Sequence, residues 1–197
     1  MTLRTPLVLA SQSPRRRRLL EQLGLAFRVQ VSPAEEVVAD GEAPAAAVRR
    51  LALDKARPVA VQHPSALTLA ADTEVVLDGR MLGKPGHPDE ARAMLRRLSD
   101  RTHTVLTGLA LVHPATERRV VACEATSVAF AALTEAEIEA YVATGSPLDK
   151  AGAYGIQDDY GAVFVRRIEG DYYNVVGLPL HRVYRLLHDH FADLLAG

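Results

Sequence analysis

The stretch LVLASQSPRRRRLLEQLG, residues 7–24, joins a short apolar run to a polar turn and then to a basic segment that ends in glycine. The apolar residues 7–10 predict a short buried strand. Pro14 is favoured at the first position of a helix, and Gly24 is typical of the residue just past a helix end. The stretch therefore predicts a strand that leads through a polar turn into a helix at about 14–23, which is the alternation of an α/β protein.

The rest of the chain continues this alternation. Further helices are predicted at 44–60, 88–98, 134–144 and 180–195, strands at 27–31, 66–71, 74–77, 102–112, 119–131 and 162–168, and loops at 148–161 and 171–179. The strand run from 66 to 77 is expected to be interrupted or bent near Asp72-Thr73, and the two longest strands are expected to form a hairpin. We therefore predict a single α/β domain, residues 1–197, with a mixed twisted sheet, flanking helices and two lobes around a central cleft.

Composition restricts the class of protein. The 197 residues are 48% hydrophobic and 24% charged, as in an ordinary globular domain. A net charge of -1, 5% aromatic residues and no tryptophan argue against a nucleic-acid partner. No apolar run is long enough for a membrane helix, and the apolar run near the N-terminus is too short for a signal peptide. One cysteine excludes an internal disulfide, and we expect a cytoplasmic protein.

The first turn of the chain has the chemistry of an anion site. Ser11, Arg15 and Arg16 surround the expected start of a helix, where free backbone N–H groups and the positive end of the helix dipole favour phosphate. The alternative interpretation is a serine N-cap followed by a solvated arginine run.

Two carboxylate positions follow. Asp72 ends a buried strand and could bind a metal or activate water, or it could cap a strand bend. Glu35 and Glu36 lie in an acidic loop, and either could supply a second carboxylate or be a solvated loop residue. The sequence leaves these alternatives open.

Lysine is rare in this chain. Of 23 basic residues only Lys55, Lys84 and Lys150 are lysine, so each could mark a place that needs a compact ammonium group. Lys84 stands in a Gly-Lys-Pro loop that lacks the spacing of a P-loop but could still hold phosphate. Gln157 ends a glycine-rich run that begins at Lys150, and its amide could pair with a base edge.

Histidine gives a weaker signal. His181 and His188 are seven residues apart on the last predicted helix, where a surface or packing role is favoured over a metal site. His103 stands near the start of a strand and could orient a neighbouring loop.

These motifs, in this order, resemble the Maf family of nucleoside triphosphate pyrophosphatases, also called septum formation inhibitor proteins. The matching segments are 9–16, 51–56, 71–73, 82–85, 107–108, 150–157 and 174–179. The resemblance implies hydrolysis of a nucleoside triphosphate between its α and β phosphates, with Mg²⁺ or Mn²⁺ as cofactor. It also implies a two-lobed mixed α/β fold, a homodimer and a cytoplasmic location.

The resemblance also assigns roles to residues. It implies that Asp72 is the proton acceptor and that Glu36 lines the metal site, and we expect Asp72 with Glu36 or Glu35 to hold the metal. Ser11, Arg15, Arg16, Lys55 and Lys84 match positions that line the phosphate and metal site.

The subtype follows from three positions. Arg15, Thr73 and Gln157 match the subtype that acts on dTTP and UTP, whereas the family often has glycine where this chain has Asp100 and Asp158. The competing interpretations are a pyrophosphatase for purine nucleotides and a nucleotide- or nucleic-acid-binding regulator of cell division.

Overall fold

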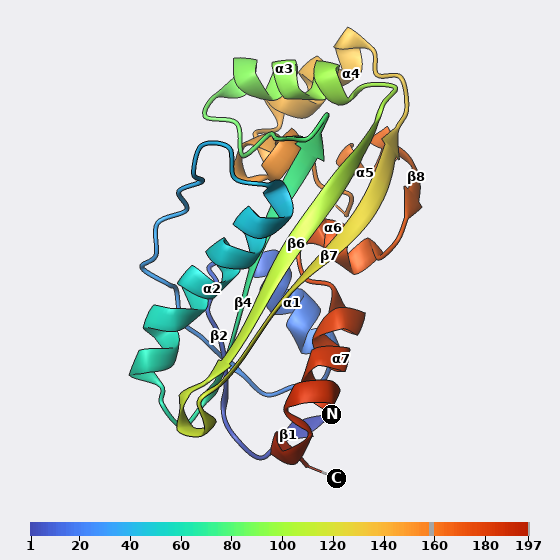
Figure 1. The fold of residues 1–197 in the computed structure, drawn as a ribbon. Helices are drawn as coiled ribbons and strands as arrows, with labels where there is room; N and C mark the ends of the chain where they lie inside the picture. The colour runs from blue at the N-terminus through green and yellow to red at the C-terminus, as the bar shows by residue number, and fades with distance from the viewer. Residues whose placement is uncertain (158–159, 197) are drawn as a thin grey trace. The chain divides into compact units, whose positions relative to one another are not determined.

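The computed structural model describes residues 1–157 and 160–196, and Asp158 lies outside the described residues (Figure 1). The helices are α1 (Pro14–Gln22), α2 (Pro44–Gln62), α3 (Pro88–Leu98), α4 (Glu135–Ala143), α5 (Gly161–Phe164), α6 (Tyr172–Val176) and α7 (Leu180–His190). The strands are β1 (Thr2–Leu3), β2 (Leu7–Leu9), β3 (Arg28–Val29), β4 (Leu67–Leu77), β5 (Arg80–Met81), β6 (Thr102–His113), β7 (Arg118–Phe130), β8 (Val165–Glu169) and β9 (Leu195–Ala196). Within the described ranges, no helix is both long enough and apolar enough to span a bilayer.

The main sheet has the strand order β3-β2-β4-β6-β7-β8, and β5 pairs with β4. Strand β2 runs parallel to both β3 and β4, whereas β8 runs antiparallel to β7. Parallel pairing of β2 requires crossover connections, which α1 and α2 supply. The predicted mixed α/β class with flanking helices is thereby confirmed.

The chain divides into two compact units. The first unit contains Met1–Asp72, Thr107–Glu124 and Gly177–Gly197, and the second contains Thr73–Leu106 and Ala125–Val176. Strands β4, β6 and β7 each pass from one unit into the other. Asp72 and Thr73 are neighbours in β4, yet they belong to different units.

One part of the core of the first unit is built from small residues. One cluster consists of Val8, Ala10, Ala52, Ala56, Val59, Ala66, Ala70 and Ala110, all buried. Helix α2 lies so close to β6 that a Cβ added at Gly108 would be 2.0 Å from the carbonyl oxygen of Val48. This close approach explains why glycine follows Thr107 in the sequence.

The core of the second unit is aromatic by contrast. Phe130 makes edge contacts with Tyr154 and His103, at ring-centroid distances of 4.7 and 5.0 Å. Tyr141 makes a similar contact with Phe164 at 5.2 Å. These rings are buried together with the apolar faces of α3 and α4.

Four local predictions are wrong in their details. Strand β4 continues without a break through Asp72, and the predicted strand at 162–168 begins with the short helix α5. Helix α6 lies in the predicted loop 171–179, where Asp171 Oδ1 accepts a hydrogen bond from the Tyr173 N–H at 2.7 Å. Such helices are too short to show a period in the sequence.

The fourth error is the end of the last helix. Helix α7 ends at His190 rather than 195, because Phe191 turns into the core and Leu195 pairs with Leu3 in the separate β1–β9 ladder. The sequence contains further apolar residues after His190, so its pattern gives no signal that the helix ends there.

Candidate active site

The centre of the first unit's polar site is a buried lysine between two carboxylates. Lys55 Nζ lies 2.5 Å from Asp72 Oδ1 and 2.7 Å from Glu36 Oε1. Helix α2 buries Ala52, Ala56 and Val59, and Lys55 lies on this same buried face. The structure thus brings three predicted site residues together. Of the two adjacent glutamates, Glu36 is the one that contacts Lys55.

Asp72 retains an oxygen for a ligand. Its side chain is 5% exposed, and among the residues that the structure describes its Oδ2 has no hydrogen-bond partner. A buried carboxylate oxygen is costly unless a proton donor, a water or a cation satisfies it. Asp72 can therefore bind a metal ion or hold a water molecule at Oδ2 while Lys55 fixes Oδ1.

The donor set suits Mg²⁺ or Mn²⁺ when substrate supplies further oxygens. The described part of the chain contains no group of three or more His, Cys, Asp or Glu that could hold a metal ion. Mg²⁺ is commonly bound by one or two carboxylates together with waters and substrate phosphates. Asp72 and Glu36 fit that mode, although both also contact Lys55.

The start of α1 supplies the cationic side. Ser13 Oγ accepts a hydrogen bond from the Arg16 N–H at 3.4 Å, so Ser13 is the N-cap and Pro14 takes the first helical position. The buried Ser11 accepts from the Ser13 N–H through its Oγ at 3.1 Å, which leaves its hydroxyl proton able to donate. The serine N-cap interpretation is therefore correct for Ser13, and it is compatible with an anion site beside it.

Arg16 is fixed and lies in the field of the carboxylates. Its Nε donates to the Gly177 carbonyl oxygen at 2.9 Å. Burial lowers the pKa of Arg16, whereas the charges of Asp72 and Glu36 raise it and that of Arg15 lowers it. The guanidinium keeps its charge at every working pH. Arg15, Arg16 and Lys55 outnumber the two carboxylates, so the cluster is suited to a polyanion.

The other predicted site residues belong to the second unit. Thr73 is half-buried on β4, Lys84 is exposed on the loop after β5, and Gln157 is half-buried in a turn. The loop of Lys84 is fixed because the Gly83 N–H donates to Glu74 Oε2 at 3.2 Å and the Leu82 N–H donates to the Val75 oxygen at 2.9 Å. Glu74 is a contact that sequence reasoning missed, since nothing in the pattern linked it to the Gly-Lys-Pro loop.

Lys150 differs from the other two lysines. Its buried Nζ donates to the Ser146 carbonyl oxygen at 2.6 Å, to Ser146 Oγ at 3.1 Å and to Asp149 Oδ1 at 2.8 Å. Acceptors that converge on one point suit a compact ammonium group better than a planar guanidinium. The lysine at position 150 is therefore explained by a structural contact.

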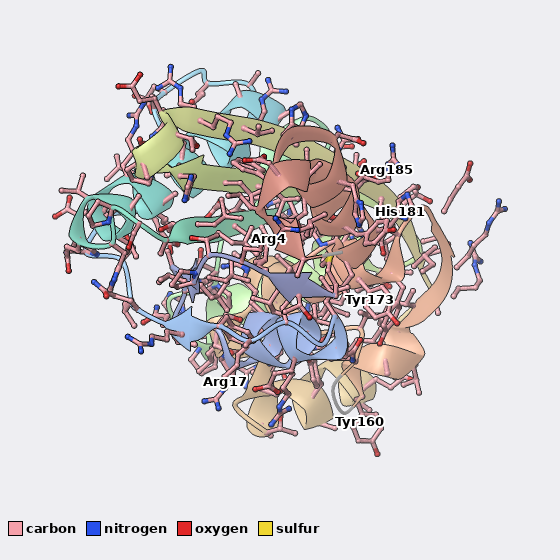
Figure 2. The ribbon with its side chains drawn as sticks, turned by 90° about the horizontal axis from the view of Figure 1, so that it is seen from below. Arg4, Arg17, Tyr160, Tyr173, His181 and Arg185 are labelled. Carbon is pink, nitrogen blue, oxygen red and sulfur yellow. The ribbon has the colours of Figure 1, made fainter. Side chains whose placement is uncertain are left out.

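The histidines lie as expected. Figure 2 shows His181 and Arg185 on the outer side of α7, and His188 on the same helix is also exposed. His103 is buried, and its Nε2 lies 2.7 Å from the Tyr154 hydroxyl in the loop that precedes Gln157. The expectation that His103 orients a neighbouring loop is confirmed.

Comparisons with known proteins agree on one family. A family model described as Maf-like protein matches residues 6–190. The dTTP/UTP pyrophosphatase of Salinibacter ruber is 60% identical over 195 residues, which cover 99% of this chain and 96% of that protein. The dTTP/UTP pyrophosphatases of Symbiobacterium thermophilum and Moorella thermoacetica are 54% and 58% identical, each over 92% of this chain and 92% and 93% of their own lengths.

Among solved structures, the Staphylococcus aureus Ham1 protein superposes with a TM-score of 0.47 at 14% identity. The superposition covers 64% of this chain and 71% of that protein.

Proposed function

The chain belongs to the Maf-like protein family, and on that premise we propose that it hydrolyses nucleoside triphosphates to a monophosphate and pyrophosphate, with dTTP and UTP preferred. The observation that carries the proposal is the buried Asp72–Lys55–Glu36 cluster, in which Asp72 Oδ2 has no partner among the described residues. Relatives that are 54–60% identical and are named dTTP/UTP pyrophosphatases support the choice of substrate.

The chemistry needs charge neutralisation more than covalent assistance. A triphosphate carries close to four negative charges, and its hydrolysis is accelerated chiefly by positioning and by electrostatic stabilisation. Arg15, Arg16 and Lys55 supply cations in the first unit, and Lys84 supplies one in the second. Ser11 adds a hydroxyl donor at the start of α1.

Asp72 then acts on the water. It accepts a proton as the water oxygen bonds to the α phosphorus and the α–β bridging bond breaks, and pyrophosphate leaves with the electron pair. Lys55 fixes Asp72 through Oδ1. Asp72 and Glu36 would hold Mg²⁺ or Mn²⁺, which when bound neutralises phosphate charge.

The base preference rests on Arg15, Thr73 and Gln157. A glutamine amide offers both a donor and an acceptor, and uracil and thymine present a carbonyl acceptor beside an N–H donor. The fit is therefore a paired hydrogen bond, and because purine edges offer the same kinds of donor and acceptor, the preference for a pyrimidine depends on where the backbone places Gln157.

Several wider features belong to the same proposal. We propose that the two units are the lobes of one domain spanning residues 1–197. We also propose a cytoplasmic homodimer that acts in nucleotide housecleaning and has no nucleic-acid or membrane partner. Size-exclusion chromatography with light scattering tests the dimer, since a mass of one chain at micromolar concentration would contradict it.

The test of the activity is pyrophosphate release from a nucleotide panel. We expect turnover of dTTP and UTP with Mg²⁺ or Mn²⁺ and none with EDTA, and slower turnover of 7-methyl-GTP and ITP. Preferred turnover of a purine nucleotide would retain the mechanism and reject the base preference. Tight nucleotide binding without turnover would instead support a regulator of cell division.

The base preference is tested separately, by a substitution at Gln157. Gln157→Glu removes the amide donor, so we expect a loss of kcat/KM for dTTP and UTP of roughly 10-fold or more, because a site group left without its partner discriminates strongly. Turnover of GTP should change little. Equal losses for all nucleotides would contradict a role for Gln157 in reading the base.

A further inference from the structure

The segment that leads to Gln157 is held at its first glycine by two other segments of the second unit. The Gly152 N–H donates to the Gly83 carbonyl oxygen at 2.8 Å, next to Lys84. Gly152 has a φ of +68°, and a Cβ added there would lie 2.8 to 3.0 Å from the side chain of Val75 on β4. The start of the segment is therefore fixed against both β4 and the Gly-Lys-Pro loop.

A second contact fixes the middle of the segment. The Tyr154 hydroxyl lies 2.7 Å from His103 Nε2 on β6, and both side chains are at least 95% buried. Burial lowers the pKa of His103 to about 4 and raises that of Tyr154, so both groups are neutral at neutral pH. Phe130 packs edge-on against both rings and excludes water from this hydrogen bond.

A third contact fixes the last glycine. The Gly155 N–H donates to the Tyr141 hydroxyl of α4 at 3.2 Å. A Cβ added at Gly161 would lie 2.5 Å from the Gly155 oxygen and 2.9 Å from the Tyr141 hydroxyl. Gly155, two residues before Gln157, is therefore held from both sides.

We propose that Tyr141, Tyr154 and His103 are positioning residues for base selection, and that they act by fixing the backbone that presents Gln157. The proposal rests on the proposed function, in which Gln157 reads the base. Paired hydrogen bonds from one amide require placement within about 0.5 Å, and displacements of about 1 Å in a site can cost 10²-fold in rate. The segment is thus tied to two other elements, to α4 through the Tyr141 hydroxyl and to β6 through its own Tyr154 hydroxyl. A core role alone would be served by phenylalanine at both positions.

The test removes one hydroxyl at a time. Tyr141→Phe and Tyr154→Phe keep the ring and its packing, and Tyr184→Phe makes the same change at an exposed position of α7 in the first unit. For both core variants we expect kcat/KM for UTP to fall roughly 5- to 20-fold, with the larger part in KM. For GTP, which the site does not select by its base, kcat/KM should stay within about twofold. Tyr184→Phe should leave both substrates unchanged.

The two tyrosine variants differ in their risk of unfolding. Among the described residues His103 Nδ1 has no partner, so Tyr154→Phe leaves the whole imidazole unpaired and is the less stable variant. Tyr141→Phe keeps the ring, removes the acceptor of the Gly155 N–H and keeps the proposal testable if Tyr154→Phe does not fold. Equal losses for UTP and GTP, or an altered melting temperature with unchanged selectivity, would overturn the inference and leave a structural role.

Gln157→Glu measured in parallel separates this inference from the proposed function. If the wild-type protein hydrolyses no nucleotide, the proposed function fails; if Gln157→Glu leaves selectivity unchanged, only the role of Gln157 in base preference fails. The inference fails in both cases. If Gln157→Glu lowers selectivity and both core tyrosine variants do not, only the inference on positioning fails.

Discussion

The two units fix their polar groups in different ways. In the first unit Lys55, Asp72 and Glu36 hold one another by charge, and Arg16 lies in the same field. In the second unit Tyr154 and His103 hold one another by a neutral hydrogen bond inside an aromatic core. A charged cluster suits a polyanionic phosphate chain, and a neutral, tightly packed segment suits the recognition of an uncharged base.

The difference has a consequence for mutations. Removing a charge from the first unit unbalances a buried cluster, so the effect should appear in the rate of the chemical step. Removing a neutral hydroxyl from the second unit should mainly lower the selectivity of the protein for UTP over GTP. Each of the following experiments perturbs one unit and leaves the other unchanged.

The largest effect is expected for Asp72→Asn. The substitution keeps the shape of the side chain and removes both the negative charge and the proton acceptor, so kcat for dTTP should fall by roughly 10²- to 10⁴-fold. Asp54→Asn on α2 is the matched control, since Asp54 pairs with Arg50 rather than with Lys55, and its kcat should stay within about twofold. A kcat for Asp72→Asn within about threefold of wild type would remove Asp72 from the mechanism.

Gly108→Ala should cause the largest loss of stability in the first unit. The new Cβ would lie 2.0 Å from the Val48 oxygen of α2, and a helix backbone cannot yield as a side chain can. We expect a loss of about 3 kcal/mol in the free energy of unfolding, measured with urea, and lower activity because α2 carries Lys55.

Gly24→Ala separates crowding from backbone strain. Gly24 has a φ of +66° and open space around its Cβ position, so alanine there should cost only about 1 kcal/mol. Equal losses for Gly24→Ala and Gly108→Ala would show that the close approach of α2 to β6 does not matter for stability.

Stability of the second unit should fall in mild acid because of His103. Its pKa is about 4 in the folded protein and about 6.5 in the unfolded chain, so between these values the unfolded chain binds more protons. The stabilisation is therefore complete above pH 6.5 and is lost as the pH falls towards 4, by up to about 3 kcal/mol.

A variant isolates this effect from that of the carboxylates. His103→Gln has no imidazole to titrate, so its free energy of unfolding should be lower than that of wild type at pH 7 and should fall less between pH 6.5 and pH 4. Parallel pH profiles for the two proteins would rule out His103 as the source of the acid sensitivity.

The local pattern of the sequence predicts the helices and strands better than it predicts the contacts between them. Apolar runs locate β4, β6 and β7, and Thr134 and Glu137, three residues apart in the sequence, form the capping box that starts α4. The contact of Lys55 with Asp72 joins residues 17 positions apart on a helix and a strand, and periodicity carries no information on such a pair. The motif order identified these residues as a group, but only the fold shows which glutamate meets the lysine.

The second unit shows the same limit more strongly. Tyr154 and His103 are 51 residues apart, and the sequence pattern places one in a glycine-rich run and the other near the start of a strand without linking them. Helix α6 was missed because its start depends on one Asp171 hydrogen bond. Contacts that depend on tertiary packing can be proposed from sequence only where a family motif groups them.

The smallest expected effect concerns Asp100, where the family resemblance leads us to expect glycine. Asp100 has a φ of 53°, a left-handed conformation that costs a residue with a Cβ about 1–2 kcal/mol, although aspartate tolerates it better than most. Glycine removes that strain but gives the unfolded chain more freedom, so Asp100→Gly should raise stability by only about 0.5 kcal/mol and the melting temperature by roughly 1–2 °C. Asp89→Gly in the first turn of α3 is the same change at a helical position and should lower the melting temperature. If Asp100→Gly also lowers it, the aspartate is stabilising its turn and the departure from glycine is not a source of strain.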